Sequence, residues 1–178
     1  MTPANRTLII YYSRSGTTAR VGHALAQRLG ADEVVIQDMR AQGHVSVVRA
    51  LLDRLFNTLP AIAPIAVPLE SYDLVVLGTP VWGGRAAAPV RRFLNDYAPR
   101  LPAVAFFCTM GGSGAESTFE DMQARLGKPP RASCSFDAKA LDNGSYLGAL
   151  DHFAMQLTGN AYSPLSSQPG PHSVPTHH

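Results

Sequence analysis

The chain has 178 residues, of which 46% are hydrophobic, 16% are charged and 8% are aromatic. This profile is typical of one soluble globular domain, long enough to bury a core without disulfide bonds or structural metals. The formal charge of +2, from 15 Lys and Arg against 13 Asp and Glu, is too small to indicate nucleic acid or an anionic membrane surface as the main partner. No apolar run is long enough to span a membrane.

Cysteine usage points to a reducing compartment. Cys108 and Cys134 lack a metal-binding spacing, and both fall in runs that are typical of buried strands. We therefore expect reduced, structural thiols. The first apolar run, residues 7–12, is too short for a secretory signal. Together these features predict a cytoplasmic protein.

Two kinds of apolar run alternate along the chain, and their alternation predicts an α/β fold with a parallel sheet. Short runs rich in Val, Ile and Leu indicate buried strands, and the last run is more polar, as expected at a sheet edge. The five predicted strands are residues 7–12, 33–37, 73–79, 103–109 and 132–139. The predicted architecture is a three-layer sandwich, a five-stranded parallel sheet with helices on both faces.

Longer segments with helical spacing of apolar residues fall between and after these strands. The predicted helices are residues 17–29, a segment that carries Val45, Val48, Leu52 and Leu55 on one face, and residues 87–97, 114–126 and 145–157. Residues 60–68 hold three prolines and predict an extended connector instead of a helix. The last 19 residues hold four prolines and show no periodicity, so we expect a domain at 1–159 and a tail at 160–178.

The candidate site lies in the loops after the first, third and fourth predicted strands, because open parallel sheets bind ligands beyond the carboxyl ends of their strands. After the first strand, the run Ser13-Arg14-Ser15-Gly16-Thr17-Thr18 places several hydroxyls around a glycine at a helix start. Unpaired amides and the helix dipole favour an anion there, so the run predicts a phosphate site. The alternative is that Ser15 or Thr17 only caps the helix.

The second loop, residues 79–85, contains Trp82, the only tryptophan of the chain, between Val81 and two glycines. An indole in a loop offers a flat apolar face on which a planar heteroaromatic ring can stack. The alternative is that Trp82 packs beneath the loop as a structural plug. In the third loop, residues 109–114, several glycines allow the backbone to approach a ligand closely, and Ser113 with Glu116 fits a helix capping box.

A serine hydrolase is the main alternative from another class. Residues 111–115 nearly match the G-x-S-x-G elbow around Ser113, and Asp137 or Asp142 and then His152 follow in triad order. However, His152 falls in a predicted helix, and this hypothesis leaves the hydroxyl-rich first loop unexplained. A cofactor-free interaction module remains a third reading if the anion site has no ligand. No metal site is expected, because the histidines of the tail have no rigid element to fix them.

In order along the chain, the three loops resemble those of the flavodoxin family. Residues 13–18 match the pattern [ST]-x-[ST]-G-x-T directly after a strand, and residues 73–83 and 106–114 resemble the second and third loops of that family. The resemblance extends over roughly residues 6 to 158. It implies the flavodoxin strand order 2-1-3-4-5, with the ligand at the switch point between strands one and three.

The resemblance also implies one non-covalently bound FMN, with no catalytic residue or metal ligand assigned. The phosphate is expected at Ser13, Arg14 through its backbone, Ser15, Gly16, Thr17 and Thr18. The ribityl chain and ring are expected at Thr79, Pro80, Val81, Trp82 and Gly83, with Thr109, Met110, Gly111 and Gly112 bordering the isoalloxazine from the third loop.

The implied function is electron transfer to a partner protein or reduction of quinone-type acceptors. As an enzyme, the protein would be of the NAD(P)H:quinone reductase type. Such reductases of related fold often complete the site with a second subunit, which would make the chain a homodimer. Unlike strongly acidic carriers, the chain places Arg85 beside Trp82, which predicts a higher flavin potential. With Met110 in place of a second aromatic residue, one flavin face is expected to be open to a quinone or nicotinamide.

Overall fold

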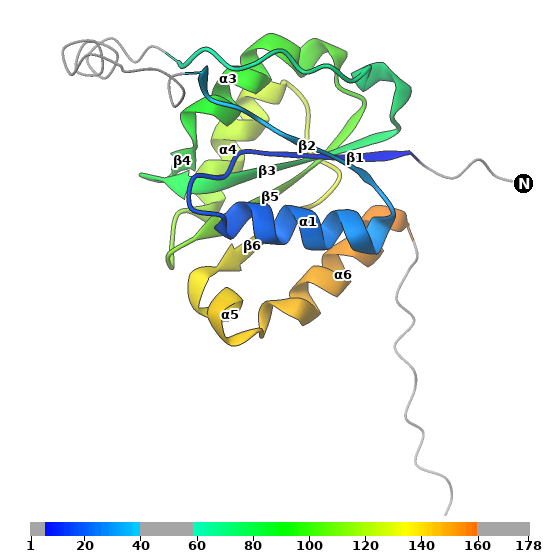
Figure 1. The fold of residues 1–178 in the computed structure, drawn as a ribbon. Helices are drawn as coiled ribbons and strands as arrows, with labels where there is room; N and C mark the ends of the chain where they lie inside the picture. The colour runs from blue at the N-terminus through cyan, green and yellow to red at the C-terminus, as the bar shows by residue number, and fades with distance from the viewer. Residues whose placement is uncertain (1–5, 40–58, 160–178) are drawn as a thin grey trace, which may run out of the picture.

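Five parallel strands form the central sheet in the order β2-β1-β3-β5-β6, and a two-residue strand, β4, pairs with the end of β3 (Figure 1). The structure is a computed structural model and describes residues 6–39 and 59–159. The strands are β1 (Thr7–Tyr11), β2 (Asp32–Val35), β3 (Leu74–Trp82), β4 (Arg85–Ala86), β5 (Ala103–Met110) and β6 (Ser133–Asp137). Counted over the predicted strands, this is the order 2-1-3-4-5, so the predicted fold class is confirmed.

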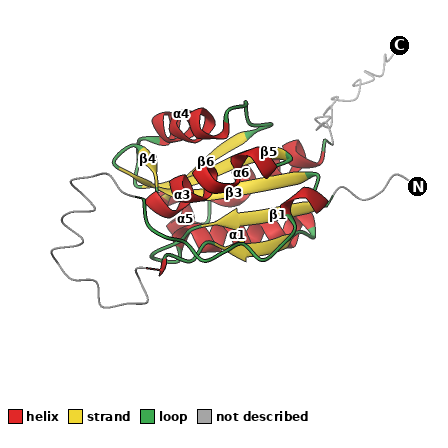
Figure 2. Ribbon diagram, turned by 90° about the horizontal axis from the view of Figure 1, so that it is seen from above, coloured by secondary structure: helices red, strands yellow, loops and turns green. Residues whose placement is uncertain are grey.

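Helices cover both faces of the sheet. One layer consists of α1 (Thr17–Leu29), α5 (Ala138–Asn143) and α6 (Tyr146–Thr158). The other layer consists of α3 (Ala88–Tyr97) and α4 (Ala115–Leu126), with the short 3₁₀ turns η2 (Leu69–Ser71) and η3 (Ala98–Arg100) nearby. Figure 1 shows these layers on opposite sides of the strands, and in the view from above of Figure 2 helices lie across the strands. Within the described ranges, no helix is long and apolar enough to cross a membrane.

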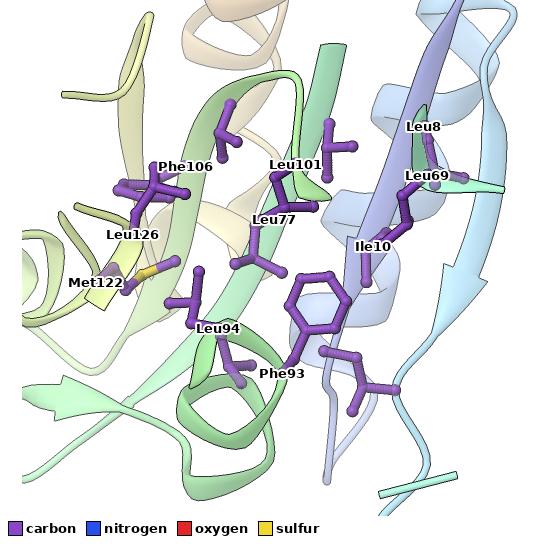
Figure 3. Close-up of a cluster of buried hydrophobic side chains, with 14 of the residues drawn as sticks. Leu8, Ile10, Leu69, Leu77, Phe93, Leu94, Leu101, Phe106, Met122 and Leu126 are labelled. Atoms are coloured by element: carbon purple, nitrogen blue, oxygen red, sulfur yellow. The ribbon is translucent and has the colours of Figure 1, made fainter. Parts of the chain in front are cut away.

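The sheet separates two hydrophobic cores, because successive side chains of a strand point to opposite faces. On β3, Leu77 packs with Phe93 and Phe106 beneath α3 and α4 (Figure 3). Its neighbour Val76 belongs to the second core, with Phe107 and the helices α1 and α6. The central strands are therefore buried on both faces, which is why they are continuous apolar runs in the sequence.

Several predicted boundaries are wrong. The fifth strand ends at Asp137, and residues 138–139 begin the short helix α5. Asp137 accepts a hydrogen bond from the Lys139 amide with Oδ1, which caps α5 and ends the strand. The strand predicted at 73–79 continues to Trp82 as one arm of a hairpin. The predicted helix at 45–55 and the tail at 160–178 lie outside the described residues.

Candidate functional site

The three predicted loops meet at the carboxyl edge of the sheet around one cavity of about 250 Å³. Ten of the predicted cofactor-binding residues line it, together with Ala138, which sequence reasoning missed. The lining residues are Arg14, Ser15, Thr17, Thr18, Pro80, Val81, Trp82, Thr109, Met110, Gly111 and Ala138. The topology thus brings together segments almost 100 residues apart in the sequence.

The first loop ends at Gly16, which is the N-cap of α1. Its φ of 88° is in the left-handed region that favours glycine, and no side chain caps the helix. The hydroxyls of Ser15 and Thr17 are 3.2 Å apart and hydrogen-bond each other. The alternative that Ser15 or Thr17 serves as helix cap is therefore wrong. The first amides of α1 have no capping side chain and can donate to a ligand.

Ser13 contributes the most informative polar atom of the site. Its Oγ is buried and has no hydrogen-bond partner among the described residues. A buried hydroxyl without a partner is costly, and a native structure normally satisfies such a group with protein, water or ligand. Because Ser13 directly precedes the loop around Gly16, its hydroxyl and the helix start can bind the same anion.

A buried hydrogen bond joins the first loop to the third. The Oγ1 atoms of Thr18 and Thr109 are 2.8 Å apart, and the two residues are 1% and 5% exposed. Both residues also belong to the cavity wall. Thr18 therefore holds the first turn of α1 against the end of β5, which fixes the distance between the anion site and the third loop.

The second loop is the hairpin of β3 and β4. Its turn consists of Gly83 and Gly84, with φ of 58° and 72°, as two-residue hairpin turns require. Trp82 is 40% exposed, so it is not a buried plug. The rings of Trp82 and Tyr12 make an edge-to-face contact, with their centroids 5.6 Å apart and their planes at 87°. The indole thus lies at the mouth of the cavity with Tyr12 as its aromatic support.

Thr79 is one predicted contact residue that does not line the cavity. It is fully buried, its Oγ1 accepts a hydrogen bond from the Ala87 amide at 2.9 Å, and it donates to the Pro80 carbonyl at 3.0 Å. These bonds tie the base of the hairpin to the start of α3. Thr79 therefore positions the hairpin, while Pro80, Val81 and Trp82 form the wall. Ser13, Gly16, Gly83 and Gly112 likewise lie near the cavity without lining it.

The third loop brings Met110 and Gly111 into the wall. Farther along, Gly114 is the N-cap of α4 without a side-chain bond, so the predicted capping box of Ser113 and Glu116 is wrong. A Cβ on Gly114 would lie 3.2 Å from the Gly84 Cα. Only glycine at this position allows the third loop and the hairpin to pack so closely.

The structure offers no support for a serine hydrolase. Ser113 is exposed, and no hydrogen bond joins it to His152, Asp137 or Asp142 within residues 6–39 and 59–159. His152 lies exposed on α6. The same ranges contain no group of three His, Cys, Asp or Glu side chains that could hold a metal ion.

Tyr12 is the main site residue that sequence reasoning missed. It directly follows β1, and in the sequence it looks like the last apolar residue of that strand. Its amide donates to the Gly78 carbonyl at 3.2 Å, which extends the ladder between β1 and β3. Burial and the nearby Asp38 carboxylate raise the pKa of Tyr12, while Arg14 lowers it. The net effect favours the neutral phenol.

An open parallel sheet with a hydroxyl-rich helix start and an exposed indole around one edge cavity defines a flavodoxin-like protein. The profile of the flavodoxin family matches residues 6–143, more than three quarters of the chain. The chain belongs to the flavodoxin family.

Solved structures agree with the fold. The chain is similar to a flavoprotein from Lactobacillus acidophilus NCFM, crystallised in complex with FMN, with 23% identity and a TM-score of 0.64 over 80% of this chain and 99% of that one. A candidate flavoprotein from Bacteroides eggerthii DSM 20697 gives 23% identity and a TM-score of 0.62 over 82% of this chain and 98% of that one.

Proposed function

We propose that this chain binds one FMN non-covalently in the edge cavity and acts as a redox protein. The observation that carries the proposal is the buried Ser13 Oγ beside the start of α1, because no side chain in the described ranges bonds this hydroxyl or caps the helix. Membership of the flavodoxin family and the FMN complex of the L. acidophilus flavoprotein support the choice of ligand.

The phosphate end of the ligand fits the first loop. Ser13 can donate its orphan hydroxyl, and the hydroxyls of Ser15 and Thr17 lie at the rim of the same loop. The Gly16 backbone leaves open space, since apart from its two chain neighbours no described heavy atom lies within 4 Å of the position that a Cβ would take. Together with the positive end of the α1 dipole, these groups would hold a dianion without a lysine.

The ring end of the ligand fits the space between the hairpin and the third loop. Trp82 offers an exposed indole for stacking, and Met110 and Gly111 of the third loop line the same cavity. Bound FMN would supply the electron-transfer and hydride chemistry, which the side chains of this site cannot perform alone. The protein's part is to orient the ring and to set its potential.

The residues that line the cavity are compatible with two routes by which bound FMN could pass on its electrons. Because the third loop contributes Met110 and not an aromatic side chain, one face of the bound ring would be open. A small quinone or nicotinamide can then approach for hydride transfer, and a protein partner can also dock at the exposed Trp82. We propose a role in electron transfer or quinone reduction in the cytoplasm, where Cys108 and Cys134 remain free thiols.

The test begins with protein purified without added cofactor. An absorption spectrum of oxidised flavin, and saturable binding of FMN to the apoprotein at one equivalent per chain, are the expected results. Riboflavin should bind more weakly than FMN, because it lacks the phosphate. Absence of FMN binding to folded apoprotein would overturn the proposal.

A second assay separates enzyme from carrier. Steady-state oxidation of NADH or NADPH by the FMN-loaded protein is measured with and without a quinone. Turnover that depends on the quinone supports a reductase of the NAD(P)H:quinone type. Bound flavin that is reduced by dithionite but not by either nucleotide supports a one-electron carrier. Sedimentation of the loaded protein then tells whether the reductase is a homodimer.

A further inference from the structure

Few contacts of the described residues hold the Trp82 side chain in place. The indole is 40% exposed and follows the part of β3 that is paired in parallel with β5, which ends at Pro80. Among the described residues, the strand pairing of Trp82 is with Arg85 of β4, across a turn of two glycines. Within the described part of the chain, its one aromatic contact is the ring of Tyr12.

Tyr12 in turn stands next to the anion site. Its side chain packs partly buried against the core below α3, and the following residue is Ser13, with the orphan hydroxyl. The group that would contact phosphate and the ring that supports the indole therefore belong to adjacent residues. A ligand that fixes the backbone of Ser13 also fixes Tyr12, and with it the edge on which Trp82 rests.

We propose that Tyr12 is a positioning residue that couples the anion site to the stacking face of Trp82, so that an anion in the first loop raises the affinity of the cavity for a flat aromatic ring. This inference rests on the proposed function, because it takes the anion and the ring to be the two ends of FMN. Tyr12 itself needs no contact with either end.

Coupling of this kind is reciprocal. If inorganic phosphate raises the affinity for riboflavin, riboflavin must raise the affinity for phosphate by the same factor. An edge-to-face aromatic contact limits that factor to about 2- to 10-fold, the range that such pairs contribute beyond burial. A merely structural Tyr12 would change both affinities without any dependence of one ligand on the other.

The experiment uses apoprotein, inorganic phosphate and riboflavin as separate probes. Trp82 is the only tryptophan, so its fluorescence reports the stacking site alone. In the wild type, phosphate should shift Trp82 emission and raise riboflavin affinity by about 2- to 10-fold. In Tyr12→Leu, phosphate should still bind, as measured by calorimetry, but both effects should disappear. Tyr12→Phe keeps the ring edge and should restore them.

Two further variants make the result decisive. Trp82→Leu removes the contact between Tyr12 and Trp82 by replacing the more exposed partner, so the variant should fold normally. It should also abolish the dependence of riboflavin affinity on phosphate. Tyr97→Leu is the matched control, because Tyr97 is also a partly buried tyrosine in an aromatic pair, stacked on Phe93 away from the cavity. It should leave the coupling unchanged.

The outcomes separate the two proposals. If wild-type protein binds neither FMN nor riboflavin, the proposed function is wrong and this inference is lost with it. If FMN binds but phosphate and riboflavin bind independently in the wild type, or if Tyr12→Leu and Trp82→Leu both keep the wild-type factor, the coupling through Tyr12 is wrong while the proposed function stands.

Discussion

At the scale of single residues, the site is defined by the buried Ser13 hydroxyl, for which the described residues provide no hydrogen-bond partner. Ser13 follows the last buried positions of β1, so its side chain is enclosed by the sheet edge while its backbone opens into the loop. Hydrogen bonds to charged groups are worth about 1.5–3 kcal/mol, more than those between neutral groups. A phosphate oxygen would therefore gain substantially from this position.

Replacing Ser13 tests that gain. We expect Ser13→Ala to weaken FMN binding by roughly 10- to 100-fold, the loss of one hydrogen bond to a charged group. Riboflavin affinity measured without phosphate should change little. Titration of apoprotein followed by flavin fluorescence measures both constants. Ser133→Ala, at the exposed start of β6 on the other edge of the sheet, is the control and should bind FMN as the wild type does. Equal losses for both flavins would contradict a role at the phosphate.

The residue pattern predicted most of the residues that line the edge cavity. Hydroxyls around Gly16 and a lone loop tryptophan are local signals, because they reflect a backbone conformation and an exposed ring. Tyr12 and Thr79 could not be assigned in this way, since an aromatic or β-branched residue at a strand end has the same local pattern whether it fills a core or supports a ligand site. Their partners, Trp82 and the Ala87 amide, are known only from the fold.

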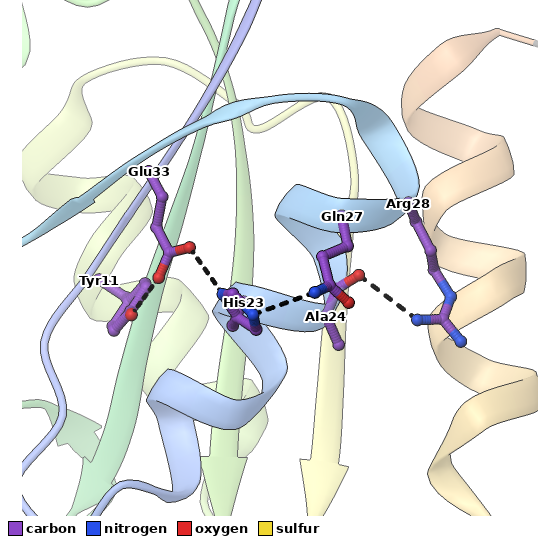
Figure 4. A network of polar contacts seen from close by, with 6 residues as sticks. All are labelled: Tyr11, His23, Ala24, Gln27, Arg28 and Glu33. Atoms are coloured by element: carbon purple, nitrogen blue, oxygen red, sulfur yellow. Dashed lines mark hydrogen bonds and ion pairs between the residues drawn. The ribbon is translucent and has the colours of Figure 1, made fainter.

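At the scale of elements, the contact of α1 with β1 depends on a glycine in the middle of the helix. Gly22 leaves room for the ring of Tyr11, and any Cβ at this position would overlap that ring. Tyr11 in turn donates its hydroxyl to Glu33 of β2, which also contacts His23 Nδ1 at 3.1 Å (Figure 4). The helix α1, the strand β1 and the edge strand β2 are thus joined through one aromatic side chain.

Two glycine variants should have opposite effects on stability. In a helix interior, Gly→Ala ordinarily stabilises by about 0.5–1 kcal/mol. We expect that gain for Gly148→Ala on α6, where, beyond the adjacent residues and the backbone of the helix itself, no described atom lies within 4 Å of the new Cβ. Gly22→Ala should instead destabilise by about 1–3 kcal/mol, because the Tyr11 ring must move. Urea unfolding gives both values, and stabilisation by Gly22→Ala would show that the ring is free to shift.

The hairpin of β3 and β4 places a cation beside Trp82, the proposed stacking residue. Arg85 pairs with Trp82 across the Gly83–Gly84 turn and is exposed. A positive charge near the ring stabilises a reduced, anionic flavin more than the neutral oxidised form. Sequence reasoning placed Arg85 in a loop, whereas the strand pairing holds it directly opposite the indole.

Reversing this charge should lower the potential. In the FMN-loaded protein, Arg85→Glu should shift the midpoint potential to more negative values by on the order of tens of millivolts, and the shift should shrink at high ionic strength. A spectroelectrochemical titration measures it. Arg92→Glu is the control, because Arg92 lies on α3, where it pairs with Asp96. A potential that is unchanged in Arg85→Glu would mean that Arg85 does not act on the flavin.

At the scale of the whole molecule, the two cores place one cysteine where water does not reach it. Burial, and to a lesser extent the neighbouring Cys134, raises the pKa of the Cys108 thiol from its ordinary 9.0 to about 12. Burial also raises the pKa of Cys134 to about 11. Both thiols therefore stay protonated in the folded protein at pH values where the unfolded chain has lost their protons.

This difference makes stability depend on alkaline pH. The native state holds more protons than the unfolded state above pH 9, so the stabilisation is complete below about pH 9 and is lost as the pH rises toward 11 or 12. We expect the free energy of unfolding to fall between about pH 9 and 11, and to fall less steeply in the double variant Cys108→Ala/Cys134→Ala. Denaturant unfolding across this range tests it, and equal slopes would contradict the assignment.

The sequence by itself determined the fold class, because the order of strands and helices follows from apolar runs whose period depends only on local backbone geometry. It also determined the chemistry of the first loop, where hydroxyls, a glycine and a helix start are neighbours in the chain. The tertiary structure alone decided that β3 continues into a hairpin, that Thr79 anchors it, and that Tyr12 supports Trp82. Those features arise from contacts between segments far apart in the sequence, which no local pattern encodes.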